Sequence, residues 1–159
     1  MKLGILGTLS LAIMLISQIS FAETVKIGFV TTLTGGAGAI GNDMRDAVEL
    51  ALDHLGRKMG GSNVKVIYED DTFKPAVGKQ KTEKLVKKDK VHFVGGYIWS
   101  HVLMASRNSV VGKGPFMISS NAGPGPVAGK LCHEDFFSTS WQNDQTTMAM
   151  GEVLNQLGV

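Results

Sequence analysis

The sequence predicts an α/β fold with a mostly parallel sheet and helices on both faces. Two observations indicate this fold. Runs of strand character alternate four times with segments of helical periodicity, and the first such run has the β-branched composition of a buried parallel strand. Right-handed crossovers between successive parallel strands then place helices on both faces of the sheet.

The first strand and helix follow a short N-terminal segment. Thr24–Thr32 (TVKIGFVTT) is predicted as a strand, and a glycine-rich turn follows it. From Asn42 to Arg57 apolar residues recur with a period of 3.6, which predicts an amphipathic helix capped by Asn42 or Asp43. Glycines then end the helix, and Val64–Tyr68 is predicted as the second strand.

The next part of the chain repeats the same alternation. Pro75 suits a first helical position, and this helix is predicted to continue to Lys90. Val91–Ile98 is predicted as the third strand, Ser100 as the cap of the next helix, and Phe116–Ser120 as the fourth strand.

The last part contains a Gly/Pro loop, a short apolar run and one more helix. The loop covers Asn121–Gly129, the apolar run covers Phe136–Ser140, and helical periodicity begins at Asp144. Gly158 is predicted to end this helix as its C-cap. A complete domain more usually ends in an exposed polar tail, so we expect the sequence to stop within a larger architecture.

The first 22 residues fit a secretory signal peptide. Lys2 precedes an apolar run, Leu3–Ile16, and Ser20-Phe21-Ala22 provides the small-residue end that such peptides have. A membrane-spanning helix needs about 20 apolar residues, and polar residues interrupt the run before that length. We therefore predict export and cleavage after Ala22, with an uncleaved anchor as the alternative.

Composition argues against nucleic acid as a partner. The 16 Lys and Arg residues nearly balance the 14 Asp and Glu residues. The lysine-rich stretch 79–90 is interpreted as a solvated helix face. Cys132 is the only cysteine in the sequence. In an exported protein it is a free thiol, an intermolecular pair, or half of a bridge whose partner lies in absent sequence.

Residues 36–41 spell G-x-G-x-x-G between a predicted strand and a predicted helix, as in a dinucleotide site. The next acidic cluster, Glu69–Asp71, lies beyond the spacing of about 20 residues expected for the ribose contact. An exported domain also does not normally meet cytosolic nucleotides. We therefore interpret the glycines as a tight turn into a helix, which can still line a ligand cleft.

No catalytic or metal motif is recognisable in the sequence. The four histidines have spacings that match no metal motif, and Ser119 and Ser120 lack a G-x-S-x-G context. Asp70 and Asp71 lie between a strand and a helix, where carboxylates are usually solvated or capping groups. We therefore predict that the protein is not an enzyme and uses no metal or cofactor.

The loops that follow the strands form the candidate ligand site, because ligands of open α/β sheets bind beyond the carboxyl ends of the strands. Three segments lie at these ends: Thr34–Gly38, Tyr97–Ser100 and Ser120–Gly123. Amides at a helix start favour an anion, and the Ser100 hydroxyl and the Asn121 amide add hydrogen-bonding groups. Trp99 and Tyr97 either form an apolar wall for the ligand or pack between strand and helix.

Five segments together resemble the amino-terminal lobe of a type I periplasmic substrate-binding protein, in the branched-chain amino-acid (Leu/Ile/Val) receptor family of ABC importers. In order, they are KIGFVTTLTGGAGAIGNDMRDAVELALD, YEDDTFKPAVG, FVGGYIWSHVLMAS, PFMISSNAGPGP and FFSTSWQNDQ. Members of this family have two lobes that close on the ligand. The resemblance implies that residues 23–159 form the N-terminal ligand-binding lobe and that the second lobe is missing.

The resemblance also implies which residues bind the ligand. In this family a serine region after the third strand holds the ligand's carboxylate and amino group, and groups after the fourth strand contribute. The corresponding residues here are Trp99, Ser100, Asn121, Ala122 and Gly123. Ile98 and Trp99 stand where amino-acid receptors usually have small hydroxyl residues. Trp99 and Trp141 point to a flatter or aromatic ligand.

We therefore predict the substrate-binding component of an ABC importer. It would bind a small carboxylate-bearing solute, an amino acid or an aromatic acid, in the periplasm and deliver it to a permease in the inner membrane. The full-length protein is expected to be a monomer. The alternatives are a sensor module of the same fold, with residues 1–22 as an anchor, and an exported hydrolase or nucleotide-binding enzyme.

Overall fold

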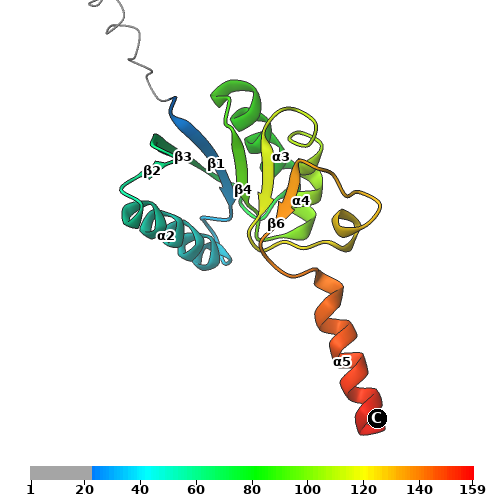
Figure 1. Ribbon diagram of the computed structural model, residues 1–159. Helices are drawn as coiled ribbons and strands as arrows, with labels where there is room; N and C mark the ends of the chain where they lie inside the picture. The colour runs from blue at the N-terminus through cyan, green and yellow to red at the C-terminus, as the bar shows by residue number, and fades with distance from the viewer. Residues whose placement is uncertain (1–22) are drawn as a thin grey trace, which may run out of the picture.

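The computed structural model describes residues 23–159, so the predicted signal peptide lies outside the described residues. A six-stranded sheet in the order β2-β3-β1-β4-β5-β6 organises the chain (Figure 1). The strands are β1 (Val25–Thr31), β2 (Lys58–Met59), β3 (Ser62–Asp70), β4 (Phe93–Gly96), β5 (Phe116–Ser119) and β6 (Phe136–Ser138). β2 runs antiparallel to β3, and the other four neighbouring pairs are parallel. The predicted α/β class with a mostly parallel sheet is confirmed.

Helices lie on both faces of the sheet, as predicted. They are α2 (Gly38–His54), α3 (Pro75–Lys84), which a π-helical turn extends to Asp89, α4 (Ser100–Arg107) and α5 (Asn143–Leu157). α2 lies on one face, and α3 and α4 pack together on the other (Figure 1). The pleat of β1 separates the faces: a Cβ on Gly28 would touch Leu85 after α3, whereas the hydroxyl of Thr31, three residues further along the strand, contacts Met44 of α2.

The hydrophobic core lies between the sheet and the α3–α4 layer. Val30, Val94 and Met117, one from each of three neighbouring parallel strands, have no exposed surface. Leu85 and Leu103 close the core from the helical side, also without exposed surface. Full burial of a side chain of this size contributes about 1.5–3 kcal/mol, so this layer dominates the stability of the fold.

A hairpin that was not predicted from the sequence follows α2 and consists of β2 and β3. Only a glycine break was expected before Val64–Tyr68, but β3 begins at Ser62 and pairs with β2. Gly60 and Gly61 both have positive φ, 57° and 84°. Two such residues form the tight turn that favours a two-residue hairpin, which explains the extra strand.

The first helix begins earlier than predicted. Asn42 or Asp43 was expected as its cap, but α2 starts at Gly38 and Asn42 lies within it. The Asn42 side chain donates to the carbonyl oxygens of Gly38 (2.7 Å) and Leu33 (3.1 Å). Asn42 therefore ties the first turn of the helix to the loop after β1, and does not cap the helix N-terminus.

Two glycines of the G-x-G-x-x-G pattern allow α2 to approach the end of β1. A Cβ built on Gly41 would lie 1.8 Å from the carbonyl oxygen of Thr32, and one on Gly38 would lie 2.8 Å from that of Leu33. Both glycines are buried. The pattern thus meets a requirement of helix–strand packing.

α5 extends away from the sheet and the other helices (Figure 1). Within the described chain none of its residues is buried, and the apolar side chains Met148 and Leu157 are exposed. Its N-terminus is nevertheless well defined: Gln142 is the cap of a capping box with Gln145. Gly158, with φ 71°, is the predicted C-cap, which is confirmed.

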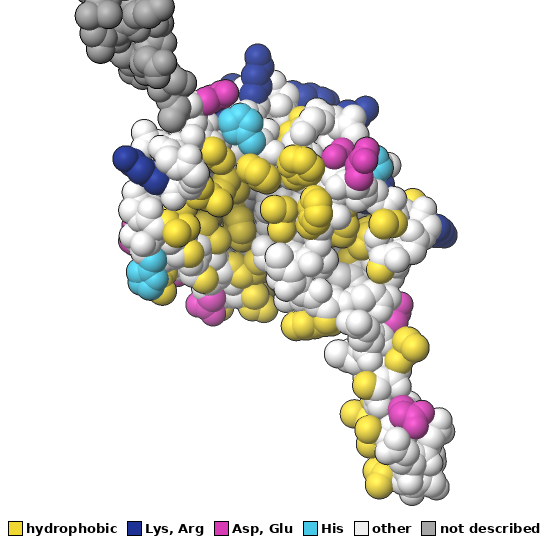
Figure 2. Space-filling model, in the orientation of Figure 1, with side chains coloured by type: hydrophobic (Ala, Val, Ile, Leu, Met, Phe, Trp, Pro, Cys, Tyr) yellow, Lys and Arg dark blue, Asp and Glu magenta, His cyan; other side chains and the backbone are white. Residues whose placement is uncertain are grey.

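An aromatic row crosses the sheet face beside α2. Phe93, Phe116 and Phe137 lie on β4, β5 and β6, with ring centroids 5.9 and 6.0 Å apart. Phe116 and Phe137 are exposed, and Figure 2 shows apolar side chains gathered on this face. We call these three residues the aromatic row.

Candidate ligand-binding site at the carboxyl edge of the sheet

The loops after β4 and β5 lie together, as the sequence predicted. The amide of Ser120 donates to the Gly96 oxygen (2.9 Å), and the amide of Ala122 donates to the Tyr97 oxygen (2.9 Å). The Asn121 side chain adds a third bond, from its Nδ2 to the Ile98 oxygen (2.9 Å). Because neighbouring parallel strands end at the same edge, the two loops form one continuous surface.

Trp99 lines a hollow at this edge. The hollow measures about 400 Å³ and is bounded by Thr34–Ala37, Thr72, Phe73 and Trp99. The Trp99 indole Nε1 donates to the hydroxyl of Thr32 (2.9 Å), and the edge of the Phe73 ring meets Trp99 with centroids 4.6 Å apart. Trp99 is half-buried. It therefore presents a fixed aromatic surface toward the hollow.

Tyr97 belongs to the core. It has no exposed surface, and its hydroxyl lies 2.7 Å from that of Thr82 on α3. The alternative in which Tyr97 packs between strand and helix is correct. Its φ of 66° and the φ of 103° at Gly96 turn the chain out of β4 two residues earlier than the sequence predicted.

Ser100 is the first residue of α4, and Trp99 occupies the N-cap position without a capping side chain. The prediction that Ser100 caps this helix is therefore wrong. The Ser100 Oγ instead accepts a hydrogen bond from Asn143 Nδ2 (2.9 Å). Its proton is consequently free to be donated elsewhere, next to the positive end of the helix dipole. This combination favours an anionic group.

Ala122 and Gly123 are buried beneath the loop surface. The Ala122 oxygen accepts from the Ser119 hydroxyl (2.5 Å), and the Gly123 oxygen accepts from the amide of Asn143 (2.8 Å). A Cβ on Gly123 would lie 2.0 Å from the Trp141 oxygen. These two residues therefore shape the site by letting α5 begin close to the loop.

Trp141 lines a different hollow. Its side chain is 56% exposed and borders a hollow of about 320 Å³ between the 3-10 turn Gly125–Ala128 and the start of α5. Gly123 and Gln142 line the same hollow. The structure thus brings Trp99, Ser100 and Asn121 to one surface and places Trp141 in a neighbouring hollow.

Sequence reasoning missed the turn that carries Phe73. Thr72 and Phe73 have φ values of 50° and 63°, in the left-handed region that ordinary residues rarely adopt. The Asp70 carboxylate accepts from the Thr72 amide (2.8 Å), and Asp71 accepts from the Phe73 amide (2.9 Å). Aspartates that bond the backbone two residues on are a turn signal, so Asp-Asp before Thr-Phe could have revealed it.

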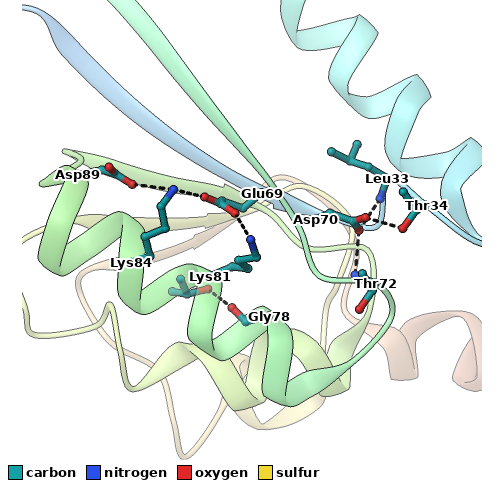
Figure 3. A network of polar contacts seen from close by, with 10 residues as sticks. Leu33, Thr34, Glu69, Asp70, Thr72, Gly78, Lys81, Lys84 and Asp89 are labelled. Atoms are coloured by element: carbon teal, nitrogen blue, oxygen red, sulfur yellow. Dashed lines mark hydrogen bonds and ion pairs between the residues drawn. The ribbon is translucent and has the colours of Figure 1, made fainter.

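Of the two carboxylates before this turn, Asp70 is half-buried and Asp71 is buried, and both bind backbone amides, which agrees with the capping role among the two roles expected. Asp71 has no exposed surface. Burial raises the pKa of Asp70, but hydrogen bonds from the Thr34 hydroxyl and from the amides of Leu33 and Thr72 outweigh it and lower the pKa below its usual value (Figure 3). Both groups therefore organise the loops of the site.

Glu69 is an internal acid that pairs with two lysines of the basic helix face. Lys81 and Lys84 of α3 both pair with its carboxylate, which is 8% exposed (Figure 3). Burial raises the pKa of Glu69, but these two pairs outweigh it and lower the pKa below its ordinary value. These lysines neutralise an internal acid, so they are not a free binding patch.

Residues 23–159 contain no cluster of three or more histidine, cysteine or acidic side chains placed to hold a metal ion. Among the same residues, no helix has the length and apolar character needed to cross a membrane. Cys132 is exposed, and within the described chain it is a free thiol.

The fold and the site together define a class. The sheet is open and mostly parallel, with an aromatic hollow and an accessible helix start at the carboxyl ends of its strands, an arrangement typical of α/β ligand-binding domains. The sequence profile described as "Periplasmic binding protein" matches residues 24–159. The chain belongs to this family, as a type I member related to the branched-chain amino-acid receptors, and the predicted resemblance is confirmed.

Individual relatives agree with this placement. The Leu/Ile/Val-binding protein BraC3 of Rhizobium johnstonii is 28% identical over 114 residues, covering 68% of this chain and 31% of its own. An ABC transporter substrate-binding protein from Sphaerobacter thermophilus is 31% identical with a TM-score of 0.73, over 77% of this chain and 34% of its own. A solute-binding protein of an ABC transporter from R. palustris, in complex with benzoate, is 26% identical with a TM-score of 0.80, over 86% of this chain and 38% of its own. This chain spans about a third of the length of the relatives it matches.

Proposed function

We propose that this chain forms the N-terminal ligand-binding lobe of the substrate-binding component of an ABC importer. It binds a small carboxylate-bearing solute in the periplasm after removal of residues 1–22, and a permease in the inner membrane receives the solute. No chemical step is involved, and the full-length protein acts as a monomer without nucleic acid. Family membership supports this assignment, because the proteins to which this chain is similar include ABC transporter substrate-binding proteins.

The observation that carries the proposal is the neighbourhood of Trp99 and Ser100. The Ser100 hydroxyl and the first amides of α4 offer hydrogen bonds to a carboxylate, while Trp99 and Phe73 border the adjoining hollow with aromatic surface. A hollow of about 400 Å³ is within the usual range for small-molecule sites. A flat carboxylate such as benzoate matches this pairing of polar and aromatic groups.

Isothermal titration calorimetry of the full chain tests the proposal, with benzoate, 4-hydroxybenzoate, isoleucine and leucine as probes. At least one carboxylate is expected to bind saturably, and Trp99→Ala is expected to raise its Kd at least tenfold, about 1.4 kcal/mol. Trp141→Ala is the matched control, because Trp141 borders the other hollow, and a smaller effect is expected. No saturable binding, or an unchanged Kd in Trp99→Ala, would contradict the proposed site.

A further inference from the structure

Asp71 lies beneath the ligand hollow and makes two hydrogen bonds with one oxygen. Its side chain has no exposed surface. The Oδ1 atom accepts from the hydroxyl of Thr32 (2.5 Å) and from the backbone amide of Phe73 (2.9 Å). These two donors come from the loops after β1 and β3, so one carboxylate joins two segments that line the hollow.

The hydroxyl of Thr32 links Asp71 to Trp99. Its hydroxyl accepts from the Trp99 Nε1 (2.9 Å) and lies 2.5 Å from Asp71 Oδ1. A carboxylate only accepts and an indole N–H only donates, so the single hydroxyl proton of Thr32 must point to Asp71. The direction of every bond in the series Trp99 to Thr32 to Asp71 is therefore fixed.

Asp71 also restrains Phe73, through a hydrogen bond to its backbone amide. Its φ of 63° is unfavourable for a residue with a side chain, and the bond from its amide to Asp71 stabilises that conformation. The Phe73 side chain is 49% exposed, and its ring meets Trp99 nearly at right angles, at 80°. An exposed aromatic ring thus stays beside Trp99 because the turn beneath it is tied to Asp71.

We infer that Asp71 is a positioning residue for the ligand site, which fixes Trp99 through Thr32 and Phe73 through its backbone without touching the solute. The inference rests on the proposed function of this hollow. It also limits how the Trp99 side chain contacts a solute: its only donor, Nε1, is already engaged, so the side chain contributes its ring surface and the carboxylate must be held by backbone amides or other side chains.

Substitutions of Asp71 can separate its role in positioning the aromatic side chains from its effect on stability, because its two carboxylate oxygens have different surroundings. Within residues 23–159, Asp71 Oδ2 is buried and has no hydrogen-bond partner. A buried carboxylate oxygen without a partner opposes folding. Asp71→Asn keeps an acceptor for Thr32 and Phe73 at the Oδ1 position, removes the charge and places an amide NH2 where Oδ2 has no partner, so it should preserve the hydrogen bonds to Thr32 and Phe73 whatever it does to stability. Asp71→Leu removes both acceptor positions and should release both aromatic side chains.

The direct test uses Trp141→Phe as background, so that Trp99 is the only tryptophan of the chain. Thr32→Val removes the hydroxyl with little change of shape, and Thr32→Ser restores it. In the ligand-free protein, acrylamide quenching of Trp99 is expected to increase in Thr32→Val and Asp71→Leu and to return toward the background value in Thr32→Ser and Asp71→Asn. Unchanged quenching in Thr32→Val and Asp71→Leu would overturn the inference.

Affinity gives the second readout, with benzoate as probe and each Kd compared with that of the Trp141→Phe background. Thr32→Val is expected to raise the Kd about tenfold, with partial rescue in Thr32→Ser. Glu69→Gln is the matched control, because Glu69 is a buried acid near the end of β3, two residues before Asp71, and it pairs with lysines of α3 instead of with Thr32 or Phe73. An equal rise in Glu69→Gln would assign the effect to general destabilisation and overturn the inference.

If the background protein binds no probe, the proposed function fails, and the quenching result still decides whether Asp71 positions Trp99.

Discussion

Asn143 Nδ2 donates a hydrogen bond of 2.9 Å to Ser100 Oγ, and this bond joins the first residues of α4 and α5 across 43 positions of the chain. The amide of Asn143 also donates to the Gly123 oxygen (2.8 Å). The start of α5 is therefore anchored on both loops of the candidate site, although the helix itself extends away from the lobe.

Replacing Ser100 separates its role toward a solute from its role toward α5. Ser100→Ala removes both the proton offered to a carboxylate and the acceptor used by Asn143. Since a hydrogen bond to a charged group contributes about 1.5–3 kcal/mol, we expect the Kd for benzoate to rise at least tenfold. Asn143→Ala keeps the Ser100 hydroxyl, so its Kd should change far less. Isothermal titration of both variants measures the difference, and equal losses would show that only the bond to α5 matters.

Gly41 tests the close approach of α2 to β1. A Cβ at this position would lie 1.8 Å from the Thr32 oxygen, so either the helix or the strand must move. Overpacking of this kind costs about 1–3 kcal/mol, and we expect Gly41→Ala to lower the free energy of unfolding in urea by at least that amount. Gly36→Ala is the control, since no described atom lies within 4 Å of the added methyl group. Equal stability of the two variants would contradict the packing role of the glycine pattern.

Glu69 gives the protein a pH-dependent contribution to stability. Its pKa in the folded state is lowered, because the pairs with Lys81 and Lys84 outweigh burial. A group whose folded pKa is lowered stabilises the fold above its unfolded pKa, about 4.3 for glutamate. That contribution is lost as the pH falls through the folded pKa. Wild type should therefore exceed Glu69→Gln in stability at pH 7, and the difference should shrink below about pH 4.

Urea unfolding at a series of pH values between 7 and 3 measures this difference. Glu83→Gln is the matched control, because Glu83 pairs with Lys87 on the solvent side of the same helix. Exposed pairs of this type contribute little, so the control should show a much smaller difference at every pH. A difference for Glu69→Gln that does not change with pH would argue against the lowered pKa.

The sequence predicted those features that follow from strand order alone. Trp99, Ser100 and Asn121 were predicted to lie together, because loops after neighbouring parallel strands share one edge of the sheet, and they do. The start of α2 was predicted wrongly because the glycines were interpreted as a turn before the helix, whereas Gly38 and Gly41 lie within its first turns and pack against the chain at the end of β1.

The turn at Phe73 could not be predicted in the same way. Its geometry depends on positive φ values at two ordinary residues, which are stable only because Asp70 and Asp71 accept their amides. The contact of Phe73 with Trp99 joins loops after β3 and β4, which β1 separates in the sheet. Periodicity in the sequence carries no information on such a contact, so a main part of the hollow was found only in the structure.

The aromatic row predicts binding of apolar dyes by the chain. Phe116 and Phe137 are 41% and 52% exposed and lie on one sheet face with Phe93, so together they present a continuous apolar surface. The double variant Phe116→Thr/Phe137→Thr is expected to reduce the fluorescence of bound 1-anilinonaphthalene-8-sulfonate. Each substitution should cost only about 1 kcal/mol, because a half-exposed ring gains about half of the free energy of full burial. Threonine suits a strand, so the sheet should persist.

Leu50→Thr is the control: Leu50 is 58% exposed on α2 and lies outside the aromatic row, so its replacement should leave dye fluorescence nearly unchanged. Dye binding that persists in the double variant would place the apolar surface elsewhere, on α5, whose exposed Met148 and Leu157 are the next candidates for substitution.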